Sequence, residues 1–124
     1  MQKKILIIDD SEFVQKTFLT VLSIGGFQVT VAKEGSAGLV AIAKEKPDLI
    51  LLDLMMPVLD GFKLLSLLKA DPNTAGIPVI VLSGKGNSEE ISRAVSLGAK
   101  DYLIKSTTPP KKVLQKVKEA LDST

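Results

Sequence analysis

Five short apolar stretches alternate with five longer stretches of helical periodicity along this chain. Three of the apolar stretches, at 5–8, 49–52 and 77–82, are continuous, and such runs bounded by turn signals are typical of strands buried on both faces. Residues 27–31 alternate between apolar and polar, which predicts a half-exposed edge strand, and 101–104 supplies the last strand. Regular alternation of strand and helix predicts a parallel sheet covered by helices on both faces.

The segments between the strands carry apolar residues three and four positions apart, which is the helical pattern. Phe13 and Val95 occupy such positions, so we expect both on the buried faces of their helices. Ser11, Asp60 and Ser88 are expected to cap the first, third and fourth helices. We predict helices over 11–24, 36–46 and 60–70, a short helix opened by Ser88 and ended by Gly98, and a last helix opened by Pro109 or Pro110.

Right-handed crossover connections leave few arrangements for parallel strands linked in this way. We predict an α/β fold with one doubly wound five-stranded parallel sheet in the order 2-1-3-4-5, the flavodoxin-like (βα)5 arrangement. The order is chosen partly by analogy with known folds of this pattern. A length of 124 residues fits one domain over 1–124.

Composition and charge exclude several classes of function. The chain has no cysteine and no histidine, which removes disulfides, zinc thiolate sites, redox chemistry and the commonest general base. A net charge of +2 is too small to indicate nucleic-acid or membrane binding, and we expect neither. No apolar run reaches membrane-spanning length, and the amino terminus reaches Asp9 too soon for a signal peptide, so we expect a cytoplasmic protein.

Polar side chains follow four of the five predicted strands. Asp9 and Asp10 follow the first strand, Asp53 the third, Ser83 the fourth and Lys105 the fifth. Ligands of such sheets bind beyond the carboxyl ends of the strands, so we expect these residues to share one crevice. Three carboxylates in one crevice repel one another, and at least one pKa should rise unless a cation neutralises them.

The residue types in this crevice fit a phosphoryl-transfer site. Oxygen ligands without histidine or cysteine suit a hard ion such as Mg²⁺, and the backbone carbonyl near Met55 is free to join the carboxylates as a ligand. The ammonium of Lys105 and the hydroxyl of Ser83 suit the non-bridging oxygens of a phosphoryl group. Asp53 remains as a carboxylate nucleophile that would form an acyl phosphate.

With these motifs the chain resembles the receiver domain of two-component response regulators over nearly its whole length. The resemblance implies that Asp10, Asp53 and the Met55 carbonyl bind Mg²⁺ directly, while Asp9 acts largely through water. The motifs that carry it are Asp9-Asp10, Asp53 within Asp-Leu-Met-Met-Pro-Val-Leu-Asp-Gly, Ser83-Gly84, Lys105, and Tyr102 three residues before that lysine.

The resemblance implies a phosphorylation-activated signalling switch rather than an enzyme. Asp53 would take a phosphoryl group from a sensor histidine kinase or a phosphotransfer protein, and the chain would catalyse only its own phosphotransfer and dephosphorylation. Ser83 and Tyr102 would then move inward and reshape the face made by the fourth helix, fifth strand and fifth helix. That face would control a downstream effector, with the chain as a monomer or a weak phosphorylation-dependent dimer.

One position departs from the family pattern. Proline usually follows the lysine of the fifth strand through a cis bond, whereas Ser106 stands here and the prolines come at Pro109 and Pro110. A cis bond costs about 3 kcal/mol before a non-proline residue and under about 1 kcal/mol before proline. We therefore predict a trans Lys105–Ser106 bond, or a cis bond only under tertiary constraint, with another loop path bringing Lys105 to the crevice.

Three other functions remain open from the residues alone. One is a binding module that has lost phosphorylation. The intact acidic triad disfavours this interpretation, but Ser106, in place of the usual proline, leaves it open. A hydrolase with an aspartate nucleophile would need a second acid two residues after Asp53, where Met55 stands. A flavin-binding protein would need aromatic residues around the ring, and the chain has no tryptophan and one tyrosine.

Overall fold

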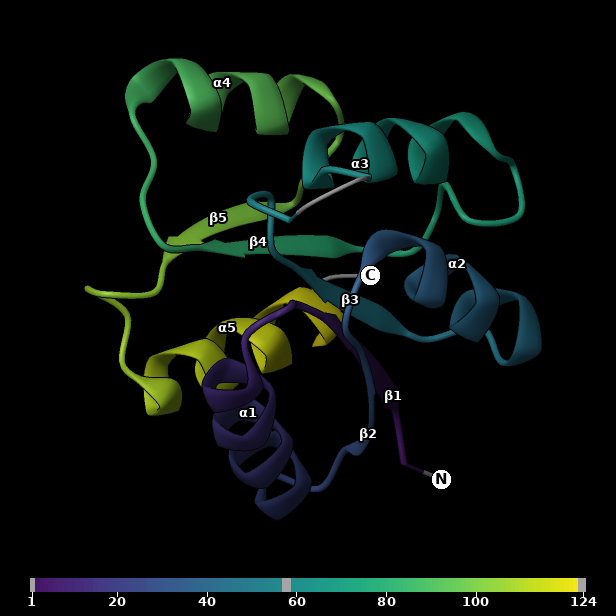
Figure 1. Cartoon of the computed structure of the whole chain (residues 1–124). Coiled ribbons are helices and arrows are strands. Elements are labelled where there is room, and N and C mark those ends of the chain that lie inside the picture. Colours follow the sequence, from purple (N-terminus) through teal and green to yellow (C-terminus); the bar gives the residue numbers. More distant parts are fainter. Residues whose placement is uncertain (1, 57–58, 123–124) are drawn as a thin grey trace.

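The computed structural model describes residues 2–56 and 59–122 and shows a parallel sheet flanked by helices (Figure 1). The strands are β1 (Lys4–Ile8), β2 (Gln28–Ala32), β3 (Leu49–Leu52), β4 (Val79–Ser83) and β5 (Asp101–Ile104). Their order is β2-β1-β3-β4-β5 with every neighbouring pair parallel, so the predicted doubly wound α/β fold is confirmed. Pro57, part of the motif after Asp53, lies outside the described residues.

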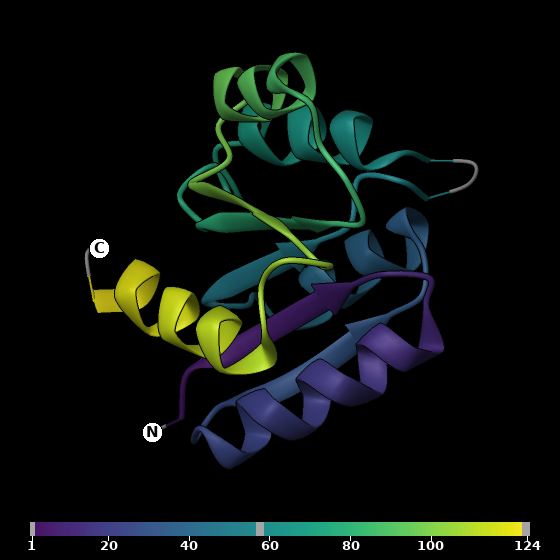
Figure 2. The same cartoon turned by 90° about the vertical axis from the view of Figure 1, so that its left-hand side faces the viewer.

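Each strand is followed by a helix. Helices α2, α3 and α4 cover one face of the sheet, and α1 and α5 cover the other, as two perpendicular views show (Figures 1 and 2). In the part of the chain that the structure describes, no helix is long and apolar enough to cross a membrane. The bounds are α1 (Glu12–Ile24), α2 (Gly35–Lys44), α3 (Gly61–Ala70), α4 (Ser88–Ser96) and α5 (Pro110–Asp122).

Alternating side chains of the central strands divide the core into two layers. Ile5 and Ile7 of β1 pack on the side of α1 and α5, whereas Leu6 and Ile8 pack on the side of α2, α3 and α4. Both faces of the sheet centre are therefore covered, as continuous apolar strands require. The edge strand β2 leaves Thr30 exposed, in agreement with its predicted half-exposed pattern.

Side chains cap three helices at their first turns. Ser11 caps α1 and Asp60 caps α3, each accepting a hydrogen bond from the backbone N–H three residues later, and both caps are as predicted. The prediction that Ser88 caps α4 is wrong, because Asn87 accepts the corresponding bond at 2.8 Å. Asparagine and serine cap helices about equally well, so two such neighbours do not reveal which one is used.

Several element bounds differ from the prediction by one or two residues, and the largest differences are in α2 and β4. Helix α2 runs over Gly35–Lys44 instead of 36–46, because the backbone of Glu45 is already extended. Strand β4 begins at Val79 instead of residue 77. Pro78 directly precedes β4 and has no N–H to donate to a neighbouring strand, which is why the continuous apolar run overestimates the strand.

The predicted burial of Phe13 and Val95 is wrong. Phe13 on α1 is 80% exposed and Val95 on α4 is 55% exposed, while their neighbours Val14 and Ala94 are buried. Consecutive helical residues point about 100° apart, so one member of an apolar pair can face the core while the other faces solvent. The sequence pattern does not say which member faces inward.

Candidate functional site

The register of β1 and β3 places two acidic residues side by side. Ile8 of β1 lies opposite Leu52 of β3, so the next residues, Asp9 and Asp53, leave the sheet together. The backbone N–H of Asp53 donates to the carbonyl of Ile8 at 2.9 Å. Asp10 follows, and the carboxylates of Asp9, Asp10 and Asp53 all lie within 4.8 Å of one another. The structure thus brings the predicted acidic triad together, with Asp9 and Asp53 buried and Asp10 exposed.

The carboxylate of Asp9 is fixed by its own chain. Its Oδ1 accepts a hydrogen bond from the backbone N–H of Ser11 at 2.9 Å. Its backbone carbonyl accepts another from Nε2 of Gln15 at 2.6 Å, and that side chain is buried on α1. Gln15 was not predicted from the sequence as a site residue. The sequence feature that could have indicated it is a polar residue next to Val14 on the inner side of an amphipathic helix.

Asp53 is held by the turn that follows it. Its Oδ1 accepts a hydrogen bond from the backbone N–H of Met55 at 3.1 Å, and the N–H of Gly61 donates to the carbonyl of Leu54 at 3.0 Å. A Cβ atom at Gly61 would lie 2.3 Å from Cα of Leu54 and 2.5 Å from the carbonyl oxygen of Asp53. Gly61 therefore permits the start of α3 to approach the backbone that carries Asp53, a role that a turn signal does not reveal.

Lys105 reaches the acidic triad from β5. Its Nζ lies 2.8 Å from Oδ2 of Asp9 and 3.7 Å from Oδ2 of Asp53. All peptide bonds of the described residues are trans, including Lys105–Ser106, as predicted. The backbone N–H of Lys105 donates to the carbonyl of Ser83 at 2.7 Å, and that of Thr107 donates to the carbonyl of Ile104 at 3.1 Å. Ser106 is therefore compatible with a lysine in the crevice.

The charges of the crevice are only partly balanced. Burial is the main cause that raises the pKa of Asp53 above the ordinary value of 3.8, and the negative charges of Asp9 and Asp10 raise it further. The hydrogen bond from Met55 and the ammonium of Lys105 lower the same pKa. The balance favours the protonated form relative to an exposed aspartate, because burial and the neighbouring negative charges both disfavour the ionised form.

Ser83 and Tyr102 carry hydroxyl groups near this crevice. The side chain of Ser83 is fully buried, and its Oγ has no hydrogen-bond partner among the described residues. The hydroxyl of Tyr102 donates a hydrogen bond to the backbone carbonyl of Lys85 at 3.0 Å, so it is directed toward Lys85 rather than Ser83. Burial raises the pKa of Tyr102, and the nearby Ser83 hydroxyl opposes that shift. A Cβ at Gly86 would lie 2.6 Å from the Tyr102 oxygen, so the ring rests against this glycine.

Comparison with known proteins shows the family. Residues 5–118 match the family described as the response regulator receiver domain. The chain belongs to this family. This match confirms the resemblance seen in the sequence motifs. Receiver domains act in two-component signal transduction as phosphoacceptor switches and are generally not enzymes.

Longer relatives and solved structures agree with this assignment. The DNA-binding response regulator MtrA of Mycolicibacterium smegmatis is 33% identical over 121 residues, which are 98% of this chain and 51% of that protein. The chain thus spans about half the length of the curated relatives it matches. A putative response regulator from Chloroflexus aurantiacus superposes with a TM-score of 0.92 at 30% identity, covering 98% of this chain and 99% of that chain. The BeF3-activated receiver domain of Klebsiella pneumoniae RstA gives 0.88 at 31% identity, with 96% and 98% covered.

Proposed function

We propose that Asp53 is the phosphoacceptor of this chain and that its phosphorylation switches a partner-binding face. The supporting observation is the position of the Asp53 carboxylate, which lies beside Asp9, Asp10 and the ammonium of Lys105 at the carboxyl ends of the central strands. Burial raises the pKa of Asp53, the charges of Asp9 and Asp10 raise it further, and a bound cation would offset that negative charge.

Mg²⁺ is the metal that this donor set fits. The three acidic side chains offer only oxygen atoms, and carboxylates within 4.8 Å of one another suit a small hard cation. We assign direct ligation to Asp10, Asp53 and the backbone carbonyl of Met55, with Asp9 acting largely through water. Bound Mg²⁺ would neutralise charge on the phosphoryl oxygens during transfer.

The transfer itself uses the side chains of this chain as nucleophile and electrostatic partners. An Asp53 oxygen attacks the phosphorus of a phosphohistidine, and an O–P bond forms while the N–P bond breaks. The imidazole leaves with the electron pair of that bond and takes a proton from water. Lys105, 3.7 Å from Asp53, then pairs with one phosphoryl oxygen, and the unpartnered hydroxyl of Ser83 donates to another.

The same hydroxyl links phosphorylation to the surface. Once Ser83 Oγ turns toward a phosphoryl oxygen, Tyr102 is expected to leave the carbonyl of Lys85 and move inward. Tyr102 belongs to strand β5, which packs against α4, so its movement would reshape the face formed by α4, β5 and α5. Such a switch requires that Tyr102 has two arrangements, outward and inward. Phosphorylation then favours the inward one because only that arrangement makes contacts with the phosphorylated site.

The proposed partners are a sensor histidine kinase or phosphotransfer protein and a downstream effector. For the residues described here we propose no direct contact with nucleic acid. The name of MtrA states DNA binding for a protein about twice as long. We propose that exchange with the kinase takes place in the cytoplasm, with the chain as a monomer or a weak dimer when phosphorylated.

The test is covalent modification by a small phosphodonor. Acetyl phosphate with MgCl2 should add one phosphoryl group to the wild-type chain, detected by intact mass, and none to Asp53→Ala. Asp122→Ala, which removes an exposed carboxylate at the end of α5, is the matched control and should be modified like the wild type. Modification of Asp53→Ala at the wild-type level would refute the assignment.

A further inference from the structure

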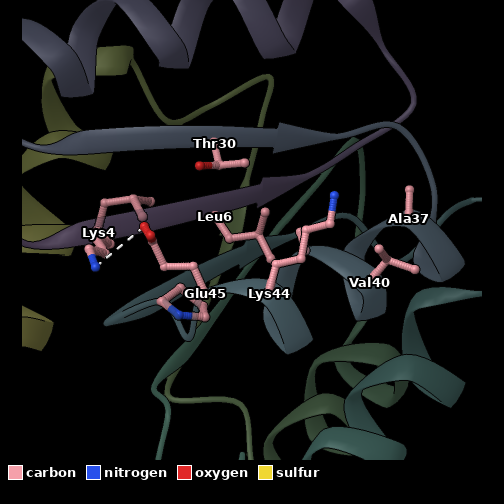
Figure 3. Close-up of a pocket in the computed structure, with 10 residues that line it drawn as sticks. Lys4, Leu6, Thr30, Ala37, Val40, Lys44 and Glu45 are labelled. Atoms are coloured by element: carbon pink, nitrogen blue, oxygen red, sulfur yellow. Dashed lines mark ion pairs between the residues drawn. The ribbon is translucent and has the colours of Figure 1, made fainter.

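A cavity of about 400 Å³ lies between helix α2 and the edge strand β2, toward the amino-terminal ends of the strands (Figure 3). None of the proposed phosphorylation residues lines it, and it opens beside α2 rather than at the carboxyl ends of the strands.

The walls of this cavity are mostly apolar. Leu6 of β1 points into it from the sheet, and Thr30 of β2 lies at its edge (Figure 3). Helix α2 contributes Ala37, Val40 and Ala41, whose small side chains leave the space between helix and sheet unfilled. This volume, with apolar walls and few polar groups, is within the range of small-molecule sites.

One lysine at this cavity forms no ion pair within the part of the chain that the structure describes. The ammonium of Lys4 pairs with Glu45 at 3.3 Å at one end. In contrast, Lys44 forms no ion pair with any residue in 2–56 or 59–122. Figure 3 shows its side chain running from α2 toward the strands, so the ammonium lies over the cavity instead of at the last carbonyls of the helix. The unpaired charge facing the cavity is therefore positive.

We propose that this cavity binds a small amphiphilic carboxylate, with the hydrocarbon part against Leu6 and Val40 and the carboxylate on the ammonium of Lys44. The apolar walls favour a ligand with a hydrocarbon body, since burial of that body removes apolar surface from water. The ammonium selects an anion, and the hydroxyl of Thr30 supplies a further donor. A cationic amphiphile of the same length would face two lysines and only one glutamate.

Sodium octanoate is the probe for a first test, added below its micelle concentration to the ¹⁵N-labelled chain. We expect saturable amide shifts confined to β1, β2 and α2 around the cavity, with a dissociation constant on the order of millimolar. Lys44→Gln should weaken binding roughly three- to fivefold, the effect of losing one exposed charge pair. Ala37→Leu should weaken it at least as much by filling the cavity from an exposed helical position.

Matched controls separate specific binding from general effects. Lys16→Gln removes one exposed lysine on α1, across the sheet, and should bind octanoate like the wild type. Asp53→Asn should also bind normally, so this result stands apart from the fate of the phosphorylation proposal. Octylammonium chloride should give no saturable shifts at the cavity. The proposal would be overturned by octanoate shifts that do not saturate. It would also be overturned if Lys44→Gln and Lys16→Gln lost octanoate affinity equally, or if octylammonium bound as tightly as octanoate.

Discussion

The side chains of Asp9 and Lys105 form an ion pair of 2.8 Å at the carboxyl ends of β1 and β5, and both are largely removed from solvent. Asp9 is itself fixed by the N–H of Ser11. The pair therefore holds the ammonium of Lys105 near Asp53 before any phosphoryl group arrives. Asp9 thus positions Lys105 in addition to its proposed role toward the metal.

Lys105→Gln should slow phosphorylation of Asp53 by acetyl phosphate roughly 100-fold, the usual effect of removing one electrostatic partner of a developing charge. The ammonium lies 3.7 Å from Asp53, where the transferred phosphoryl oxygens would gather. The rate is measured by intact mass over time at saturating MgCl2. Lys118→Gln removes an exposed lysine of α5 and should leave the rate unchanged. Equal rates in all three proteins would exclude Lys105 from the transfer.

Asp53→Asn should stabilise the metal-free chain near pH 7 by roughly 0.5–2 kcal/mol, as substitutions at functional sites often do. Because the pKa of Asp53 is raised above 3.8, mainly by burial, the folded chain holds this proton more tightly than the unfolded chain. The free energy of unfolding contributed by Asp53 therefore falls as the pH rises through the raised pKa. Asparagine does not titrate, so its advantage should shrink toward pH 4. Urea unfolding at both pH values measures this, and an advantage that is independent of pH would contradict it.

The sheet and the meeting of the acidic residues were predictable because they depend on short-range patterns. Continuous apolar runs define β1 and β3, and the residue after each run must leave the sheet at its carboxyl end. Asp9 and Asp53 therefore meet in any parallel register that aligns those ends. The trans Lys105–Ser106 bond was predictable for a similar reason, since it follows from the chemistry of one peptide bond.

Other features depend on how elements pack and were not predictable. The exposure of Phe13 depends on the rotation of α1 about its axis. In the observed rotation Val14 faces the core, and Phe13 therefore faces solvent. Gln15 becomes a support for Asp9 only when that rotation brings its amide to the Asp9 carbonyl. The need for glycine at position 61 arises from the approach of α3 to the backbone of Leu54, a contact between separate segments.

Gly61→Ala should destabilise the chain by about 1–3 kcal/mol, the cost of forcing extra volume into a packed region. The new Cβ would lie 2.3 Å from Cα of Leu54, and backbone cannot turn away as a flexible side chain can. The shift should also displace Asp53 and slow its phosphorylation. Gly76→Ala is the control, because its Cβ meets nothing within 4 Å. Unfolding in urea gives the stability, and similar losses in both variants would argue against this close approach.

Gly86→Ala should displace Tyr102 from the carbonyl of Lys85. The added Cβ would lie 2.6 Å from the Tyr102 oxygen, while a Cβ at Gly84 would meet nothing within 4 Å. Tyr102 is the one tyrosine of a chain without tryptophan, so its fluorescence reports this side chain alone. We expect altered emission in Gly86→Ala, a smaller further change on phosphorylation, and wild-type behaviour in Gly84→Ala. Wild-type emission in Gly86→Ala would show that the ring does not rest on this glycine.

Mg²⁺ should stabilise the folded chain, because Asp9, Asp10 and Asp53 form its proposed site only when β1 and β3 are paired. At free Mg²⁺ about ten times its dissociation constant, the linkage term RT ln(1 + 10) is about 1.4 kcal/mol. For a domain of this size the melting midpoint should rise by roughly 4–8 °C.

Asp10→Ala separates this metal effect from general screening by salt. Asp10 adds to the negative charge that raises the pKa of Asp53, so its removal should raise the melting midpoint of the metal-free chain. The same variant should lose most of the response to Mg²⁺, since it lacks one proposed ligand. Melts with and without MgCl2 at matched ionic strength hold screening fixed. Equal shifts in the wild type and Asp10→Ala would place the metal elsewhere and remove the support for the transfer mechanism built on this triad.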